Sequence, residues 1–155
     1  MAHETIIYGF IEGSTYKQNE YRRLQNLNKK VINHLPTEDE YPSLSRSMFS
    51  YPDIPATRGS FRSQVIHFGC SQNGLMFDDV EIWIDKFEKL LGRLYWFEAV
   101  AHMWTDYIDG CYTYWWKADD TIIESYGTNN PLTTSKWSKK MLKQTRHMDG
   151  PPTNN

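Results

Sequence analysis

The chain has 155 residues, of which 39% are hydrophobic, 15% aromatic and 23% charged, and its formal net charge is −2. This length suits one ordinary domain, which would bury roughly two thirds of the surface that its unfolded chain exposes. The composition excludes a disordered chain, and the absence of an apolar run of about 18–20 residues or a signal-peptide pattern predicts a cytoplasmic protein with no membrane partner.

The charge is divided unevenly along the chain. Residues 1–132 contain 12 Lys/Arg and 18 Asp/Glu, and residues 133–155 contain five and one, so the two parts carry net charges of −6 and +4. An acidic body lacks the broad basic surface that binds a phosphate backbone, so we expect no nucleic-acid partner. The basic segment around Lys139 and Lys143 is better explained as a solvated terminal helix than as one that contacts a membrane.

The first third of the chain predicts a strand followed by a helix. Residues 4–11 are rich in β-branched and aromatic side chains and stop before Gly13-Ser14, which predicts a central strand. Residues 15–35 have apolar side chains at helical spacing, at Tyr21, Leu24, Leu27, Val31 and Leu35, and Pro36 ends this pattern.

The next segment favours extended chain. Residues 36–60 contain four prolines, which predict turns with one short strand at residues 47–51. Residues 62–68 predict a further strand that ends at Gly69, and residues 71–74 predict a turn.

A second helix is predicted from Asp78, with Glu81 completing a capping box. It carries a broad apolar stripe that we expect to pack on a sheet, formed by Val80, Trp83, Ile84, Phe87, Leu90, Leu91 and Leu94.

The last third predicts a hairpin and a short helix. Residues 95–106 and 111–118 are strand-like and flank Asp109-Gly110, a dipeptide typical of two-residue turns. A helix of about ten residues is predicted from Thr134 or Ser135 to Arg146, and residues 148–155 are expected to be disordered. The sequence thus predicts one α+β domain over residues 1–147. It would contain a mainly antiparallel sheet of four to five strands, two main helices packed on it and the short C-terminal helix.

The hairpin would have two different faces. A two-residue turn would place Trp104 opposite Trp115, and the period of two would then separate an uncharged face from a charged one. The uncharged face, which we assign to the core, contains Tyr95, Phe97, Ala99, Ala101, Met103, Tyr112, Tyr114 and Trp116. The charged face contains Trp96, Glu98, Val100, His102, Trp104, Asp106, Thr113, Trp115 and Lys117.

The charged face has two interpretations. Tryptophan beside charged side chains is typical of the centre of a protein interface. Alternatively, the first helix or the proline-rich segment covers this face. A three-residue loop would also shift the pairing by one and move Trp116 to the charged face.

The sequence offers no convincing catalytic or metal site. His67 and Cys70 have a metal-like spacing, with Cys111 as a third candidate, but a second close-set ligand pair is missing. A thiol and base formed by Cys70 and His102 lacks support from neighbouring residues, and we expect both thiols to be reduced and partly buried. Phosphate-binding glycine loops are absent, and the pairs Asp78-Asp79 and Asp119-Asp120 fit element ends. We therefore expect no enzyme, no cofactor and no bound metal.

Lys86–Val100 (KFEKLLGRLYWFEAV), followed by YTYW at residues 112–115, resembles small bacterial immunity proteins encoded beside Rhs or contact-dependent polymorphic toxins. The resemblance covers about residues 62–118. It implies a cytoplasmic antitoxin that binds the C-terminal toxin domain of a secreted effector and blocks its active site.

The charged face of the hairpin and its turn supply the predicted partner-binding residues. They are Trp96, Glu98, His102, Trp104, Asp106, Asp109, Trp115 and Lys117. Two alternatives remain open at this point: a small enzyme that reverses a toxin's modification, and a structural adaptor of phage or secretion machinery.

Overall fold

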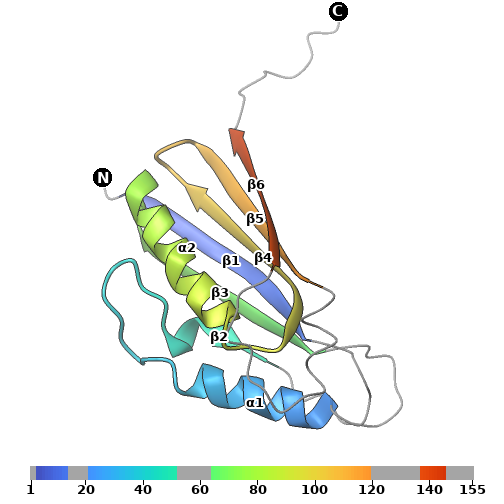
Figure 1. Cartoon of the computed structure of the whole chain (residues 1–155). Coiled ribbons are helices and arrows are strands. Elements are labelled where there is room, and N and C mark those ends of the chain that lie inside the picture. Colours follow the sequence, from blue (N-terminus) through green and yellow to red (C-terminus); the bar gives the residue numbers. More distant parts are fainter. Residues whose placement is uncertain (1–2, 14–20, 52–63, 120–136, 146–155) are drawn as a thin grey trace, which may run out of the picture.

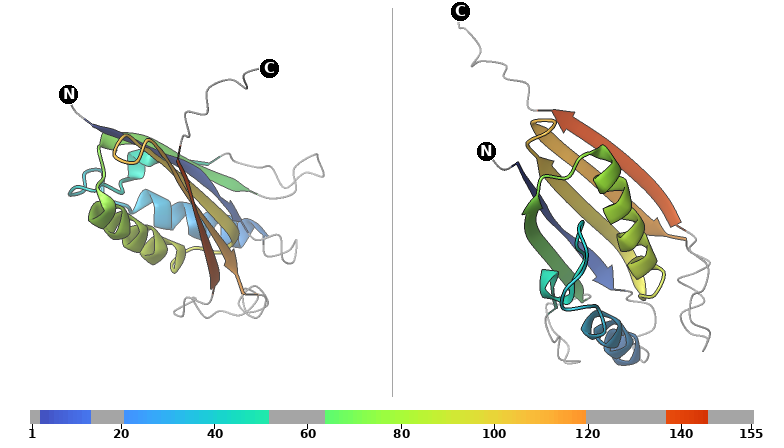
Figure 2. Two further views of the ribbon diagram at one scale, coloured as in Figure 1. Left: turned by 90° about the horizontal axis from the view of Figure 1, so that it is seen from above. Right: turned by 90° about the vertical axis from the view of Figure 1, so that its left-hand side faces the viewer.

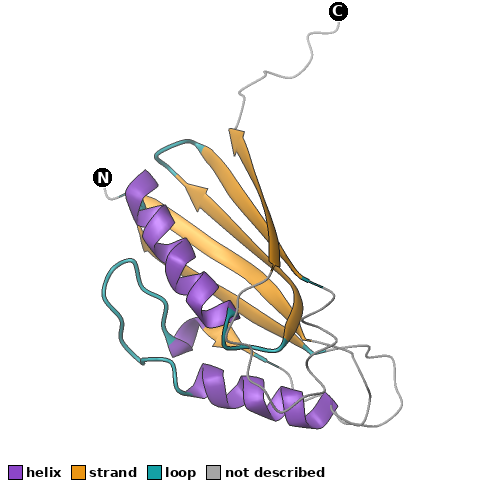
Figure 3. Ribbon diagram, in the orientation of Figure 1, coloured by secondary structure: helices purple, strands orange, loops and turns teal. Residues whose placement is uncertain are grey.

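The computed structural model describes residues 3–13, 21–51, 64–119 and 137–145, which form an α+β fold built on one antiparallel sheet (Figure 1). The strands are β1 (Glu4–Gly13), β2 (Phe49–Ser50), β3 (Val65–Asn73), β4 (Trp96–Thr105), β5 (Gly110–Ala118) and β6 (Trp137–Thr145). The helices are α1 (Tyr21–Asn33), the 3₁₀ turn η1 (Arg46–Met48) and α2 (Phe77–Leu91). Figure 3 shows how these helices and strands are distributed.

The six strands lie in the order β2, β3, β1, β4, β5, β6. The predicted central position of β1 is confirmed, because β1 pairs with β3 on one side and with β4 on the other. The predicted strand count of four to five is too low by the C-terminal strand β6. Neither of the two α-helices in these described ranges is long and apolar enough to cross a membrane.

The predicted C-terminal helix is wrong. Residues 137–145 form β6, which pairs with β5 along its whole length. The lysine spacing suits a solvated helix, but β5 offers an edge of backbone donors and acceptors that only an extended chain can pair with. The Lys139 ammonium also forms a salt bridge with the Glu88 carboxylate of α2, with an N–O distance of 2.6 Å. The same ammonium lies 5.7 Å from the centroid of the Tyr114 ring. The predicted disordered tail, residues 148–155, lies outside the described residues.

Several predicted boundaries move. Strand β3 continues through Gly69 to Asn73, so the turn predicted at residues 71–74 is mostly strand, because β1 offers a pairing partner as far as Glu4. Helix α2 begins at Phe77, and the carboxylate that accepts the Met76 N–H is Asp79 rather than the predicted Glu81. The short strand expected at residues 47–51 is η1 followed by β2. The first six residues of the predicted first helix and the C-terminal part of the proline-rich segment lie outside the described residues.

Both helices cover the same face of the sheet, which we call the helix face (Figure 2). A chain of aromatic rings crosses this face from the edge strand β2 to β5. Phe49 of β2 contacts Phe68 of β3, which contacts Phe87 of α2, and Phe87 contacts Trp116 of β5, with ring centroids 5.0–5.7 Å apart. Trp83 of α2 stacks on Phe87 at 5.1 Å. These rings join the helix α2 to both halves of the sheet.

Small residues at the sheet centre make room for these rings. Gly9 of β1 pairs with Phe68 on one side and Ala101 on the other. A Cβ atom at Gly9 would lie 1.9 Å from the Val100 carbonyl oxygen and 2.8 Å from the Phe68 ring. No side chain fits at this position.

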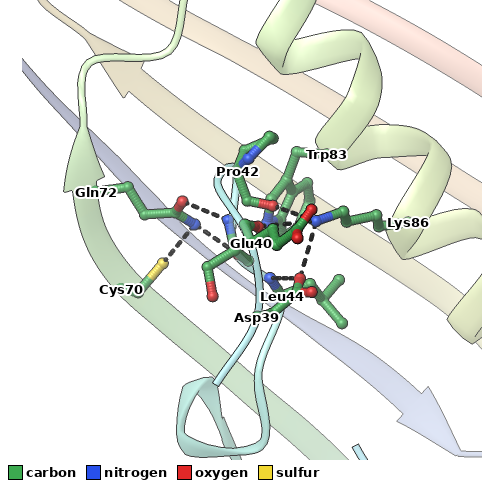
Figure 4. A network of polar contacts seen from close by, with 9 residues as sticks. Asp39, Glu40, Pro42, Leu44, Cys70, Gln72, Trp83 and Lys86 are labelled. Carbon is green, nitrogen blue, oxygen red and sulfur yellow. Dashed lines mark hydrogen bonds and ion pairs between the residues drawn. The ribbon is translucent and has the colours of Figure 1, made fainter. Parts of the chain in front are cut away.

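The segment between α1 and β2 is held to the sheet by Gln72 (Figure 4). The Gln72 side-chain amide donates to the Ser43 carbonyl at 2.7 Å and accepts from the Ser43 N–H at 2.8 Å. Trp83 donates its indole N–H to the same carbonyl at 3.1 Å. One side chain of β3 thus supplies the two hydrogen bonds that a neighbouring strand would make.

Lys86 of α2 fastens the same segment from the other side. Its ammonium donates to the Asp39 carboxylate at 2.9 Å and to the carbonyls of Glu40 and Pro42 at 3.0 and 2.8 Å. Burial by itself would raise the Asp39 pKa. The Leu44 N–H and Lys86 outweigh this effect and hold the pKa below its ordinary value of 3.8.

We expect Gly9→Ala to lower the free energy of unfolding by about 2 kcal/mol or more, because the new methyl group would separate β1 from β4 and displace Phe68. Gly69→Ala is the matched control in the neighbouring strand, where a Cβ would meet nothing closer than 3.5 Å. Urea denaturation measures both. Equal losses in the two variants would contradict the close packing at Gly9.

We expect acid to weaken the contacts that the Asp39 carboxylate makes with Lys86 and the Leu44 N–H. Because the folded state lowers the Asp39 pKa, its contribution is present above the ordinary pKa of 3.8 and is lost as the pH falls through the folded value. Asp39→Asn should therefore lower the free energy of unfolding near neutral pH, and this free energy should then decrease less between about pH 5 and 3 than it does in the wild type. Glu38→Gln should have neither effect. Urea midpoints across this pH range provide the measurement, and parallel curves for wild type and Asp39→Asn would refute the assignment.

Candidate functional site

The sheet face opposite the helices, which we call the outer face, is not covered by either helix or by any other described segment (Figure 2). Five strands contribute aromatic and aliphatic side chains to it. These side chains are Ile6, Tyr8 and Phe10 of β1, Val65 of β3, Val100 and Trp104 of β4, Trp115 of β5 and Leu142 of β6. The side chains of Ile6, Tyr8 and Leu142 are 44%, 42% and 45% exposed, which is high for apolar residues in the middle of strands.

The hairpin turn differs from the prediction, but the division of its faces is preserved. Residues 106–109 form a four-residue turn, so Trp104 pairs with Cys111 and Glu98 pairs with Lys117. The pairing is shifted by four positions, and an even shift keeps the side chains of residues 98–104 and 111–117 on their predicted faces. The three-residue loop that would have moved Trp116 outward does not form, and Trp116 is fully buried.

Gly110 explains why the turn is not Asp109-Gly110. Gly110 already belongs to β5, where it pairs with Thr105 and with Thr145 of β6. A Cβ at Gly110 would lie 2.1 Å from the Gln144 carbonyl oxygen, so glycine is needed for the close approach of β6. Asp109 instead takes the positive φ angle of the turn, at 44°.

Trp96 does not belong to the outer face, which corrects its predicted place. A bulge at Phe97 shifts the β1–β4 pairing, so Trp96 lies opposite Gly13 and Glu98 opposite Glu12. Trp96 is 2% exposed, donates its indole N–H to the Leu91 carbonyl at 2.8 Å and contacts the Trp137 ring. The same bulge leaves Phe97 only partly buried, although it was predicted to be in the core.

The structure brings five of the other predicted residues onto the outer face. Glu98, His102 and Trp104 lie on β4, and Trp115 and Lys117 lie on β5. The two remaining predicted residues, Asp106 and Asp109, are exposed in the turn at the end of this face. The charged face of the sequence analysis is therefore largely the outer face.

His102 lies at the centre of this face and is held on two sides. Its Nδ1 is 2.9 Å from the Thr113 hydroxyl, and its ring is 4.9 Å from the Tyr8 ring. Burial lowers the pKa of His102 below its ordinary value of 6.5. His102 is thus neutral near pH 7 and contributes aromatic surface rather than charge.

The contribution of β1 and β6 was missed by the sequence analysis. Tyr8 accepts a hydrogen bond from the Trp104 indole at 3.1 Å, which connects β1 to the predicted residues of the hairpin. The alternation of Ile6, Tyr8 and Phe10 along a predicted central strand was the available signal, since the period of two places all three on one face.

The outer face has pockets of different character at its two ends. At the turn end, a pocket of about 330 Å³ is lined by Ile6, Trp104, Thr105 and Gly110 with the carboxylates of Glu4, Asp106 and Asp109. Toward the other end, a pocket of about 360 Å³ is lined by Trp115, Trp116 and Ser138 with Glu98, Lys117 and Lys140. The charge of the outer face thus changes along the strands.

The geometry separates the residues that the sequence analysis considered for chemistry. His67 lies on the outer face, as does His102, whereas Cys70 lies on the helix face, so neither histidine is placed to activate this thiol. Burial raises the pKa of Cys70, which keeps it protonated. Cys70 and Cys111 are both free thiols, and within the described ranges no three His, Cys, Asp or Glu side chains converge to hold a metal ion.

Comparison with known proteins does not identify a relative. No family model matches the chain, and neither the curated proteins nor the solved structures include a significant match. The function must therefore be inferred from the residues of this chain.

The opposite orientations of two adjacent tryptophans provide a direct test of the faces. Trp116→Ala should lower the free energy of unfolding by about 3–5 kcal/mol, because it removes a buried ring from the aromatic chain of the core. Trp115→Ala removes a side chain of the same size from the outer face and should cost less than half as much. Chemical denaturation measures both values, and the reverse order would mean that the two faces are exchanged.

Proposed function

We propose that this protein is a cytoplasmic immunity protein that binds a cognate polymorphic toxin domain and masks its active site. The outer face is the single observation that carries the proposal. It presents tryptophan, tyrosine and aliphatic side chains on one sheet face, with charged side chains toward its two ends. Large exposed apolar patches with a polar rim mark interaction sites in soluble proteins.

The residue types on the outer face suit a tight protein interface. Trp104 and Trp115 are large and rigid, and each is partly buried by its strand neighbours. The hydrogen bond from Trp104 to Tyr8 holds one ring in place before binding, which reduces the entropy lost in the complex. Tryptophan and tyrosine are enriched among the residues that contribute most to binding.

Masking requires no catalysis by the bound protein. The acidic charge of residues 1–132 favours fast association with a basic cleft, such as one that accepts nucleic acid or a dinucleotide. The resemblance of Lys86–Val100 and residues 112–115 to immunity proteins supports the same assignment. The end of the first segment and the whole of the second lie in the β4–β5 hairpin, which supplies Trp104 and Trp115.

Paired variants on the two faces of the molecule test the proposal. The probe is the toxin domain encoded by the neighbouring reading frame, with affinity measured by calorimetry and protection measured by growth on co-expression. Trp104→Ala with Trp115→Ala should weaken binding by at least about 30-fold, equivalent to about 2 kcal/mol. Growth protection should be lost in parallel.

The control removes exposed apolar side chains from α2, on the other side of the sheet. Phe77→Ala with Ile82→Ala takes away side chains that are 65% and 47% exposed and should leave both affinity and protection unchanged. Unchanged affinity in the outer-face variant, or a loss of affinity in the α2 variant, would show that the outer face does not bind the toxin. If the neighbouring toxin does not bind the wild-type protein at all, the immunity function fails.

A further inference from the structure

We infer that the pocket at the turn end of the outer face receives an arginine side chain of the partner protein. This inference rests on the proposed function, because the arginine would belong to the bound partner. It assigns a specific chemistry to one part of the interface: a planar cation stacked on Trp104 and surrounded by carboxylates.

The pocket is lined by both apolar and acidic side chains. Ile6 and Trp104 supply the apolar surface, and Glu4, Asp106 and Asp109 supply three carboxylates. None of the residues that line it is a lysine or an arginine. A guanidinium group combines a flat face that stacks on aromatic rings with five N–H donors for carboxylates, so it matches both parts.

Local contacts hold the walls of the pocket without neutralising them. Asp106 accepts the Glu4 N–H at 3.0 Å, and Glu4 accepts the Ser71 hydroxyl at 2.5 Å. Trp104 is held by Tyr8 at 3.1 Å. The partners of these carboxylates are an amide and a hydroxyl, so these two contacts leave the negative charges available to a cation.

The size and spread of the charges favour arginine over a smaller cation. The pocket has a volume of about 330 Å³, which is ample for a guanidinium group and part of its aliphatic chain. In the part of the chain that the structure describes, these carboxylates do not converge as the ligands of one metal ion do. A cation with spread charge and several donors can contact more than one of these carboxylates.

The test uses the full chain and small peptides, so it does not depend on finding a toxin. The probe is acetyl-Gly-Arg-Gly-amide, and the control peptide replaces arginine with citrulline, which keeps the shape and loses the charge. Indole N–H signals are followed by ¹H–¹⁵N NMR at low salt, with the Trp104 signal assigned from a Trp104→Phe spectrum. The arginine peptide should shift this signal saturably, with a Kd of about 1 mM or weaker.

Neutral variants of the same shape test the carboxylates. Glu4→Gln, Asp106→Asn and Asp109→Asn each keep an acceptor oxygen, and asparagine tolerates the positive φ angle at position 109. The triple variant should weaken the arginine peptide by at least about tenfold. The matched control, Glu38→Gln with Glu81→Gln and Asp85→Asn, removes the same charge from exposed positions elsewhere and should bind as the wild type does.

Three results would overturn the inference: no saturable Trp104 shift with the arginine peptide, equal binding of the citrulline peptide, or equal weakening in both triple variants. If the NMR spectrum of the triple pocket variant shows that it is folded, weaker peptide binding is due to the change in the pocket and not to unfolding. If the arginine peptide binds as expected while the toxin does not, the pocket stands and the immunity function fails. If the toxin binds and the arginine peptide does not, the function stands and the pocket assignment fails.

Discussion

The packing of the α2 aromatic rings over the small residues at the sheet centre is the constraint on which the rest of the structure depends. Phe87 bridges Phe68 on one side and Trp116 on the other, and this is possible because Gly9 and Ala101 leave space between them. Dispersion and burial over several large rings stabilise the domain from one face only. Both helices pack on that face, so the opposite face of the sheet is available to solvent or to a partner.

This one-sided core separates the aromatic residues into two groups with different roles. Trp83, Trp96 and Trp116 are buried on the helix face, where they stabilise the fold. Trp104 and Trp115 lie on the outer face beside Tyr8 and His102. An antiparallel sheet with one solvated face normally carries polar side chains on that face. The apolar side chains found there instead indicate a surface that interacts with a partner.

The edges of the sheet are held by polar contacts rather than by the core. Lys139 joins β6 to Glu88 of α2, and Gln72 with Lys86 holds the segment before β2 against β3. The lysines of β6 also discourage further strand addition at an edge that is otherwise extended. With its edges held in this way, the sheet presents the outer face as a continuous surface, which suits binding to a partner.

The sequence by itself determined the α+β class, the central first strand, the second helix and the division of the hairpin into two faces. These features follow from local periodicity, and the face division survived a wrong turn because the shift in pairing was even. The tertiary structure decided the rest. The position of the turn depends on the close approach of β6 to Gly110. The burial of Trp96 depends on the bulge at Phe97, and the strand at residues 137–145 depends on the free edge of β5. Each of these outcomes is set by backbone contacts between distant segments, and local patterns carry no information about them.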